Sequence, residues 1–193
     1  MAIEDVNTGQ NPAITRAPPE LRSASKYLNA VGGKYDPGSG FSKQAILGIA
    51  VTKEMDFIEL AALSEMLVCE LIECSNPVAR LALLGKLSAT LERLHAVLLA
   101  PVPAHRLEQL SATSLPIEEP FCIGSDALML TNYCQHLVRV LLTGILPPVD
   151  QQGLTGLTFD LLHHLGEVLR TPSFTRTAEG YRDRGGGIVE PGI

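Results

Sequence analysis

Residues 57–99 read FIELAALSEMLVCELIECSNPVARLALLGKLSATLERLHAVLL, and this stretch decides the fold class. Its leucines recur at spacings of three and four, the pattern of one face of an α-helix. One series is Leu60, Leu63, Leu67 and Leu71; the next is Leu84, Leu87, Leu91, Leu94 and Leu98. The loop between the two predicted helices is very short, so these helices must fold back on each other.

Capping residues mark where these two helices begin. Asp56 and Glu59 have the spacing of a capping box, which predicts a helix from Phe57 to about Cys74. Asn76 can accept hydrogen bonds from the first free amides of the next helix, and Pro77 suits its first position. This second helix is expected to end before Pro101.

Boundary residues and apolar stripes predict two further helices. One is predicted from Ser125-Asp126 to before Pro147, and the other from about Gln151 to Arg170, with a short extra helix at 103–112. Their apolar stripes are Leu130, Tyr133, Leu137 and Leu141 in one, and Leu154, Leu157, Leu161, Leu165 and Val168 in the other. We therefore predict an all-α fold, an antiparallel four-helix bundle with loop-like or disordered tails.

The chain divides into three parts by composition. Residues 1–50 are predicted to be mostly flexible, with a short helix near 19–31 that starts at Pro19 and ends at Gly32-Gly33. Residues 51–170 form the helical bundle domain. Residues 171–193 contain the run RGGG and are predicted to be a flexible tail.

Charge and hydropathy exclude several classes of function. The net charge is −6, and residues 51–170 carry fourteen acidic against seven basic residues. An acidic body disfavours nucleic acid and anionic membranes as partners. We see no signal peptide and no apolar run long enough to span a bilayer, and therefore expect a cytoplasmic protein. The four cysteines lack zinc-site spacing, and no cofactor is predicted.

The segment DLLHHLGEVLR, residues 160–170, is the strongest candidate for chemistry. Asp160, His163, His164 and Glu167 lie together on the polar side of their predicted helix. Imidazole and carboxylate groups at such spacings can bind zinc or iron, but a second helix must supply further ligands, and none has a matching pattern. We interpret this cluster as a solvated polar side, with a metal site and acid–base catalysis as the alternatives.

The apolar residues of the first and third predicted helices cover arcs too wide for a small bundle to bury. Exposed apolar surface of this size is typical of protein interfaces, although the 19–31 helix and the 103–121 connection could also cover it. Acidic residues on the first helix would suit a basic partner. We predict a partner-binding surface made of Phe57, Leu60, Glu65, Val68, Glu70, Ile72, Val138 and Leu142.

The sequence therefore favours a non-enzymatic regulatory or adaptor protein that binds another protein, with a homodimer as one form of the assembly. Two alternatives stay open. One is a metal-dependent bundle enzyme that uses Asp160, His163, His164 and Glu167. The other is a secreted effector or its chaperone, for which the only motivation is the loose composition of the first 50 residues.

Overall fold

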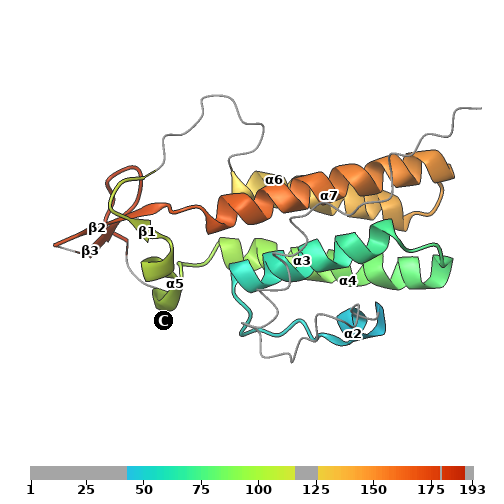
Figure 1. The fold of residues 1–193 in the computed structure, drawn as a ribbon, viewed down its shortest axis with the longest axis horizontal. Helices are drawn as coiled ribbons and strands as arrows, with labels where there is room; N and C mark the ends of the chain where they lie inside the picture. The colour runs from blue at the N-terminus through green and yellow to red at the C-terminus, as the bar shows by residue number, and fades with distance from the viewer. Residues whose placement is uncertain (1–42, 116–125, 179, 190–193) are drawn as a thin grey trace, which may run out of the picture. The chain divides into compact units, whose positions relative to one another are not determined.

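The computed structural model describes residues 43–115, 126–178 and 180–189. Helices make up 65% of these residues, and the remaining regular structure is a small sheet of three strands. The helices are α2 (Lys43–Gly48), α3 (Phe57–Ile72), α4 (Pro77–Leu98), α5 (Ala104–Gln109), α6 (Ala127–Leu142) and α7 (Pro148–Arg170) (Figure 1). The predominantly helical character is as predicted, whereas the sheet is an addition to the expected all-α class.

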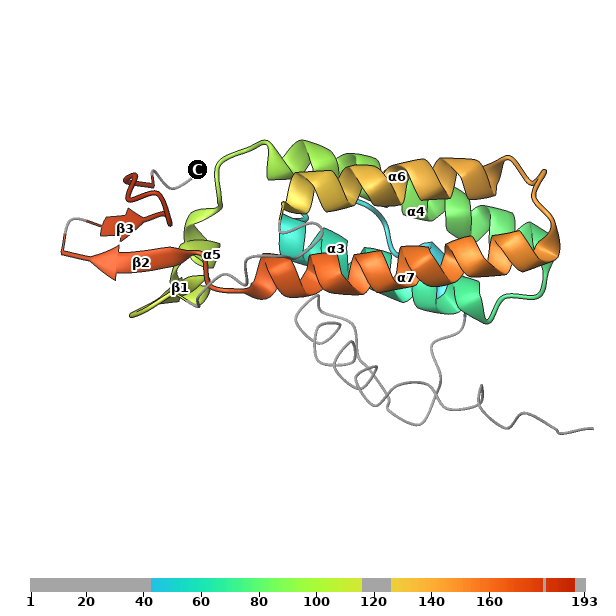
Figure 2. The ribbon, with the colours of Figure 1, turned by 90° about the horizontal axis from the view of Figure 1, so that it is seen from above.

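The four longer helices, α3, α4, α6 and α7, form what we call the helical body. Within it α3 packs against α4 and α7, and α6 packs against the same two helices (Figures 1 and 2). The predicted bounds differ from the observed ones by a few residues. α6 ends at Leu142, well before Pro147, while α7 begins at Pro148, earlier than the predicted Gln151.

The predicted caps are present and set the starts of the helices. Oδ1 of Asp56 accepts hydrogen bonds from the amides of Ile58 and Glu59 at 2.9 and 3.0 Å. The Glu59 carboxylate in turn accepts from the Asp56 amide, which completes the capping box. The side chains of Asn76 and Asp126 each accept hydrogen bonds from two amides at the starts of α4 and α6. Each such cap stabilises its helix by about 1 kcal/mol.

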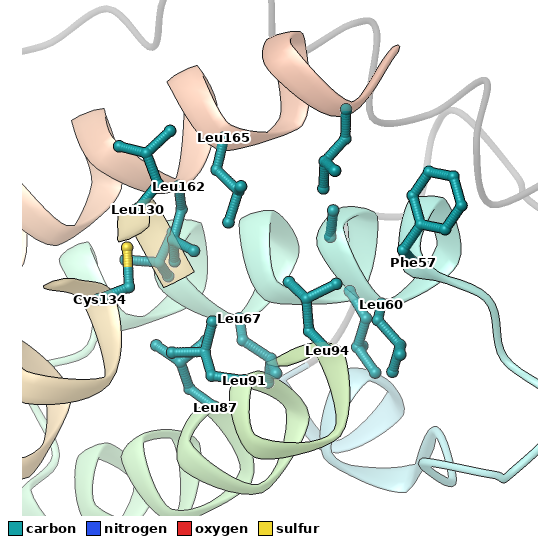
Figure 3. Close-up of a cluster of buried hydrophobic side chains, with 14 of the residues drawn as sticks. Phe57, Leu60, Leu67, Leu87, Leu91, Leu94, Leu130, Cys134, Leu162 and Leu165 are labelled. Carbon is teal, nitrogen blue, oxygen red and sulfur yellow. The ribbon is translucent and has the colours of Figure 1, made fainter. Parts of the chain in front are cut away.

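A leucine-rich core lies between the four helices of the helical body. All four contribute side chains that point toward one another, as Figure 3 shows for Leu67, Leu91, Leu130 and Leu165. Burying one such leucine stabilises the fold by roughly 1.5–3 kcal/mol relative to leaving it exposed. The predicted short helix in the connection between α4 and α6 is also present as α5, and its Leu107 is buried in the same core.

The last residues of the segment expected to be mostly flexible form the short helix α2, which packs on α3 and α4. Ile46 is buried there, and Nζ of Lys86 on α4 donates hydrogen bonds to the carbonyls of Leu47, at 2.6 Å, and Ile49. Burial lowers the pKa of Lys86. The predicted helix at 19–31 lies outside the described residues.

The sheet replaces part of the tail predicted to be a loop. β1 (Ser111–Ala112) pairs in parallel with β2 (Phe174–Thr177), and β2 pairs antiparallel with β3 (Gly180–Arg182). Phe174 is buried against the core, and the amides of Ser173 and Phe174 donate to the carbonyl of Leu110. One pairing partner of β2, the strand β1, is distant in sequence, so local composition could not reveal that pairing.

Candidate interaction surface

Among the described residues, Asp56 is the one acidic or basic side chain that is fully buried. Its Oδ2 accepts hydrogen bonds from Nε of Arg106, at 2.6 Å, and from Nε2 of His105, at 3.0 Å. Burial raises the pKa of Asp56, but hydrogen bonds from Arg106, the Glu59 amide and His105 outweigh it and leave the pKa below its ordinary value. With both oxygens engaged, this carboxylate joins α5 to the start of α3 and is a structural group.

A second polar contact joins α7 to α3. Nη2 of Arg170 donates to Oε2 of Glu65 at 2.7 Å, and both side chains are largely buried. Gly166 makes this contact possible, because a β-carbon at that position would lie 1.8 Å from Oε1 of Glu65. Glu65 was predicted to face a partner, but its carboxylate instead lies against α7.

Arg80 joins three helices at one end of the helical body. Its Nη1 donates to the carbonyl of Leu71, near the end of α3, at 3.2 Å. Its Nη2 donates to the hydroxyl of Thr155, in the first part of α7, at 2.6 Å. These hydrogen bonds place the end of α3 beside the starts of α4 and α7, and the guanidinium group is occupied by structural contacts.

The two histidines of α7 lie near Glu167 on their own helix. His163 lies 3.7 Å and His164 4.0 Å from the Glu167 carboxylate, and the ring of His163 stacks on that of Phe159. Asp160 is exposed. In the described part of the chain, no three side chains of the His, Cys, Asp or Glu type gather in a way that could hold a metal ion. Both histidines are half-buried, and the interpretation of this cluster as a solvated polar side stays a prediction.

Cys69 and Cys134 lack the features of nucleophiles. Burial, reinforced by Glu65, Glu70 and Glu73, raises the pKa of Cys69 to about 12. Burial likewise raises the pKa of Cys134 to about 12, and its side chain lies in the core (Figure 3). A thiol with such a pKa is protonated at neutral pH and reacts slowly.

Most of the predicted partner-binding surface is buried, which corrects that prediction. Phe57, Leu60, Val68 and Val138 all lie in the hydrophobic core, and Leu142 is partly buried against it. The broad apolar arc of α3 is covered because α4, α7 and α2 all pack on this helix. Of the predicted set, Ile72 is exposed, Glu70 is half-buried, and Glu65 is paired with Arg170.

For Val138 on α6, the physical reason for the error is that threonines take the place of apolar residues on the buried faces of α6 and α7. Thr131, Thr155 and Thr158 are buried, and each donates its hydroxyl to the carbonyl four residues earlier in its own helix. This removes the cost of burying a polar group. The true inner faces of α6 and α7 are therefore rotated, which brings Val138 inward and leaves Tyr133 and Leu157 exposed.

The exposed apolar side chains concentrate on the hairpin formed by α6, α7 and their connection. Eleven large hydrophobic residues are exposed in the described part of the chain, and six belong to this hairpin. We call these six the α6–α7 apolar surface: Met129, Tyr133, Val140, Ile145, Val149 and Leu157. The widths of the apolar arcs do not reveal these residues, because Tyr133 and Leu157 belong to the apolar stripes that predict burial.

Three members of the α6–α7 apolar surface form one stripe along α6. At 100° per residue, Met129, Tyr133 and Val140 lie within about 40° of one another around the helix. The Tyr133 hydroxyl donates to the sulfur of Met129 at 3.0 Å, so these two side chains are in contact. α7, which carries Leu157, packs against α6. Ile145, in the connection, is 83% exposed.

The charged groups around this surface are mostly acidic. The exposed ionised side chains between Asp126 and Arg170 are the carboxylates of Asp126, Asp150, Asp160 and Glu167 and a single guanidinium, that of Arg139. Arg170 is directed to Glu65 on α3. The hairpin therefore presents apolar side chains in a negatively charged setting.

No protein-family model, curated protein or solved structure matches this chain. In the described residues, no helix combines the length and the hydropathy that a membrane-spanning segment requires.

Proposed function

We propose that this chain is a non-enzymatic regulatory or adaptor protein that acts in the cytoplasm by binding another protein. The observation that supports this proposal is the α6–α7 apolar surface, because exposed apolar side chains gathered on neighbouring helices are typical of interaction sites. The polar clusters of the described residues support it as well, since the carboxylate of Asp56 and the guanidinium group of Arg80 are engaged in contacts between helices.

We also infer that the helical body is an antiparallel four-helix bundle. Arg80 brings the end of α3 next to the starts of α4 and α7, and the short connection 143–147 brings the end of α6 to the start of α7. α3 and α6 then run in one direction and α4 and α7 in the other. Such a scaffold holds α6 and α7 rigidly side by side, which favours a preformed binding surface.

The test compares capture of partners by matched surface variants. The binding variant carries Tyr133→Ser and Leu157→Ser, and the control variant carries Leu99→Ser, an exposed leucine outside this surface. Because all three residues are exposed, each variant is expected to unfold at nearly the wild-type temperature. Full-length proteins are used as bait in a lysate of the source cells, and each captured protein is then purified and tested for direct binding.

We expect a protein that binds the wild type and the control directly and is lost from the binding variant. Capture that is identical for all three baits would show that this surface is not the site. Light scattering of the same proteins tests the predicted homodimer, which should dissociate in the binding variant if the second copy occupies this surface.

A further inference from the structure

We propose that the α6–α7 apolar surface binds a basic amphipathic helix of another protein. This inference rests on the proposed function and specifies the chemistry of the partner. Four features carry it: the length of the apolar stripe, the kinds of side chain in it, the charge around it, and the consequence of that charge for alternative occupants.

The stripe on α6 has the dimensions of a helix-binding site. Met129 and Val140 are eleven residues apart, which corresponds to about 16 Å along the helix axis. This is roughly three turns of a partner helix, enough for apolar residues at successive i, i+3 and i+4 positions to make contact. Leu157 on the adjacent α7 widens the surface beyond a single helix. A partner helix lying along α6 and α7 would therefore bury both the stripe on α6 and Leu157 on α7.

Met129 and Tyr133 are suited to this kind of recognition. Tyrosine supplies a large, rigid apolar contact with a polar edge, and it is enriched among the residues that dominate binding energy. Methionine is flexible and polarisable, so it adapts to the shape of a partner. Their hydrogen bond, 3.0 Å from the hydroxyl to the sulfur, holds the two side chains together before a partner arrives.

The charge of the hairpin selects a basic partner. Asp150 and Asp160 flank Leu157 on α7, and Asp126 lies one turn before Met129 on α6. Arg139 is the one exposed cation among the described residues of this hairpin. Lysine or arginine residues beside the apolar face of a partner helix would meet these carboxylates, which raises the association rate and excludes acidic competitors.

The same charge argues against the other occupants. Two copies of this chain that met through the α6–α7 apolar surface would place their carboxylates opposite one another, and like charges in an interface are unfavourable. Phosphate groups of nucleic acid or anionic lipid would be repelled for the same reason. A basic helix of a different protein satisfies both the apolar and the charged features.

The experiment selects peptides on the full-length protein from a display library of helical 18-residue sequences. The library fixes leucine or isoleucine at i, i+3, i+4 and i+7 and varies the polar positions among Lys, Arg, Asp, Glu, Gln and Ser. We expect lysine and arginine to be enriched and aspartate and glutamate to be depleted. The best basic peptide is then synthesised, together with a version in which glutamate replaces each basic residue.

Fluorescence polarisation with these two peptides gives the decisive comparison. The basic peptide should bind at least about tenfold more tightly than the acidic one, a difference of about 1.4 kcal/mol. Asp150→Lys with Asp160→Lys should weaken it by a similar factor, Tyr133→Ser with Leu157→Ser should abolish binding, and Leu99→Ser should change nothing. Higher salt should weaken binding to the wild type more than to the charge-reversed variant.

Three results would overturn the inference. They are selection without a preference for basic residues, binding that is unaffected by the α6 and α7 substitutions, and a homodimer that dissociates when Tyr133 and Leu157 are replaced. None of these results alone contradicts the proposed function, which fails only if the capture of partners is also insensitive to the same substitutions.

Discussion

Replacing Gly166 with alanine tests whether the contact between α7 and α3 is specific. In an exposed helix interior this change usually stabilises by about 1 kcal/mol, because alanine has the higher helix propensity. At Gly166, however, the new methyl carbon would lie 1.8 Å from Oε1 and 2.9 Å from Cδ of Glu65, and 2.8 Å from Nη1 of Arg170. The Glu65 side chain must therefore leave its position.

The cost of this displacement decides the sign of the effect. Moving Glu65 breaks its hydrogen bond to Arg170, and a hydrogen bond between charged groups contributes about 1.5–3 kcal/mol. Set against the gain in helix propensity, the net loss for Gly166→Ala is about 1 kcal/mol, a decrease of roughly 2–4 °C in Tm for a chain of this size. Urea denaturation followed by circular dichroism measures the change in the free energy of unfolding.

A double-mutant cycle isolates the contact. In a Glu65→Ala background the obstructing carboxylate is gone, so Gly166→Ala should stabilise by about 1 kcal/mol, which gives a coupling of about 2 kcal/mol. Gly156→Ala is the matched control on the same helix, since a β-carbon there meets nothing within 4 Å, and it should stabilise in either background. If Gly166→Ala and Gly156→Ala are equally stabilising, the Glu65–Arg170 pair contributes nothing and our reasoning is wrong.

The remaining predictions concern Asp56 and the thiols. Asp56→Ala should lower the free energy of unfolding by about 3 kcal/mol, because it removes a helix cap and leaves Arg106 without its carboxylate. Asp126→Ala removes only an exposed cap and should lower it by about 1 kcal/mol. Equal losses for the two variants in urea denaturation would contradict this prediction. The pKa of Asp56 is lowered in the folded state, so the contribution of its ionised form to stability is complete above the unfolded-state pKa of about 3.9 and is lost as the pH falls through the folded-state pKa. The free energy of unfolding should therefore fall less steeply with acidification in Asp56→Ala than in the wild type. With pKa values of about 12, Cys69 and Cys134 should react with iodoacetamide at pH 8 at least roughly a hundredfold more slowly in the native than in the denatured protein, and peptide mapping that finds rapid labelling at either thiol would disprove the assignment.

The positions of the helices could be predicted because their signals are local. Asp56 with Glu59, and Asn76 with Pro77, satisfy the free amides of a helix within three residues of its start, so their spacing alone indicates the boundary. The leucine spacing then indicates how far each helix extends. The predominantly helical character follows from these two signals.

The candidate site could not be predicted because it depends on which neighbours each helix acquires. Val138 and Tyr133 are both apolar, and only the packing of α6 against α4 and α7 determines that Val138 is buried and Tyr133 is exposed. Buried threonines such as Thr158 belong to the inner face of a helix, and in the sequence they resemble surface residues. A search for apolar residues alone therefore places the inner face in the wrong direction. Phe174 belongs to a strand whose partner, β1, follows α5 and is far away in the chain.

The parallel pairing of β1 with β2 has a consequence for the order of folding. These two strands are separated along the chain by α6 and α7, so joining them closes a long loop, and the entropy cost of closure must be met before their hydrogen bonds form. During synthesis, the carbonyl of Leu110 can accept its hydrogen bonds only after Ser173 and Phe174, whose amides donate them, have left the ribosome. We therefore expect the pairing of β1 with β2 to form after α6 and α7 have docked, and amide exchange in β2 measures how readily that pairing opens.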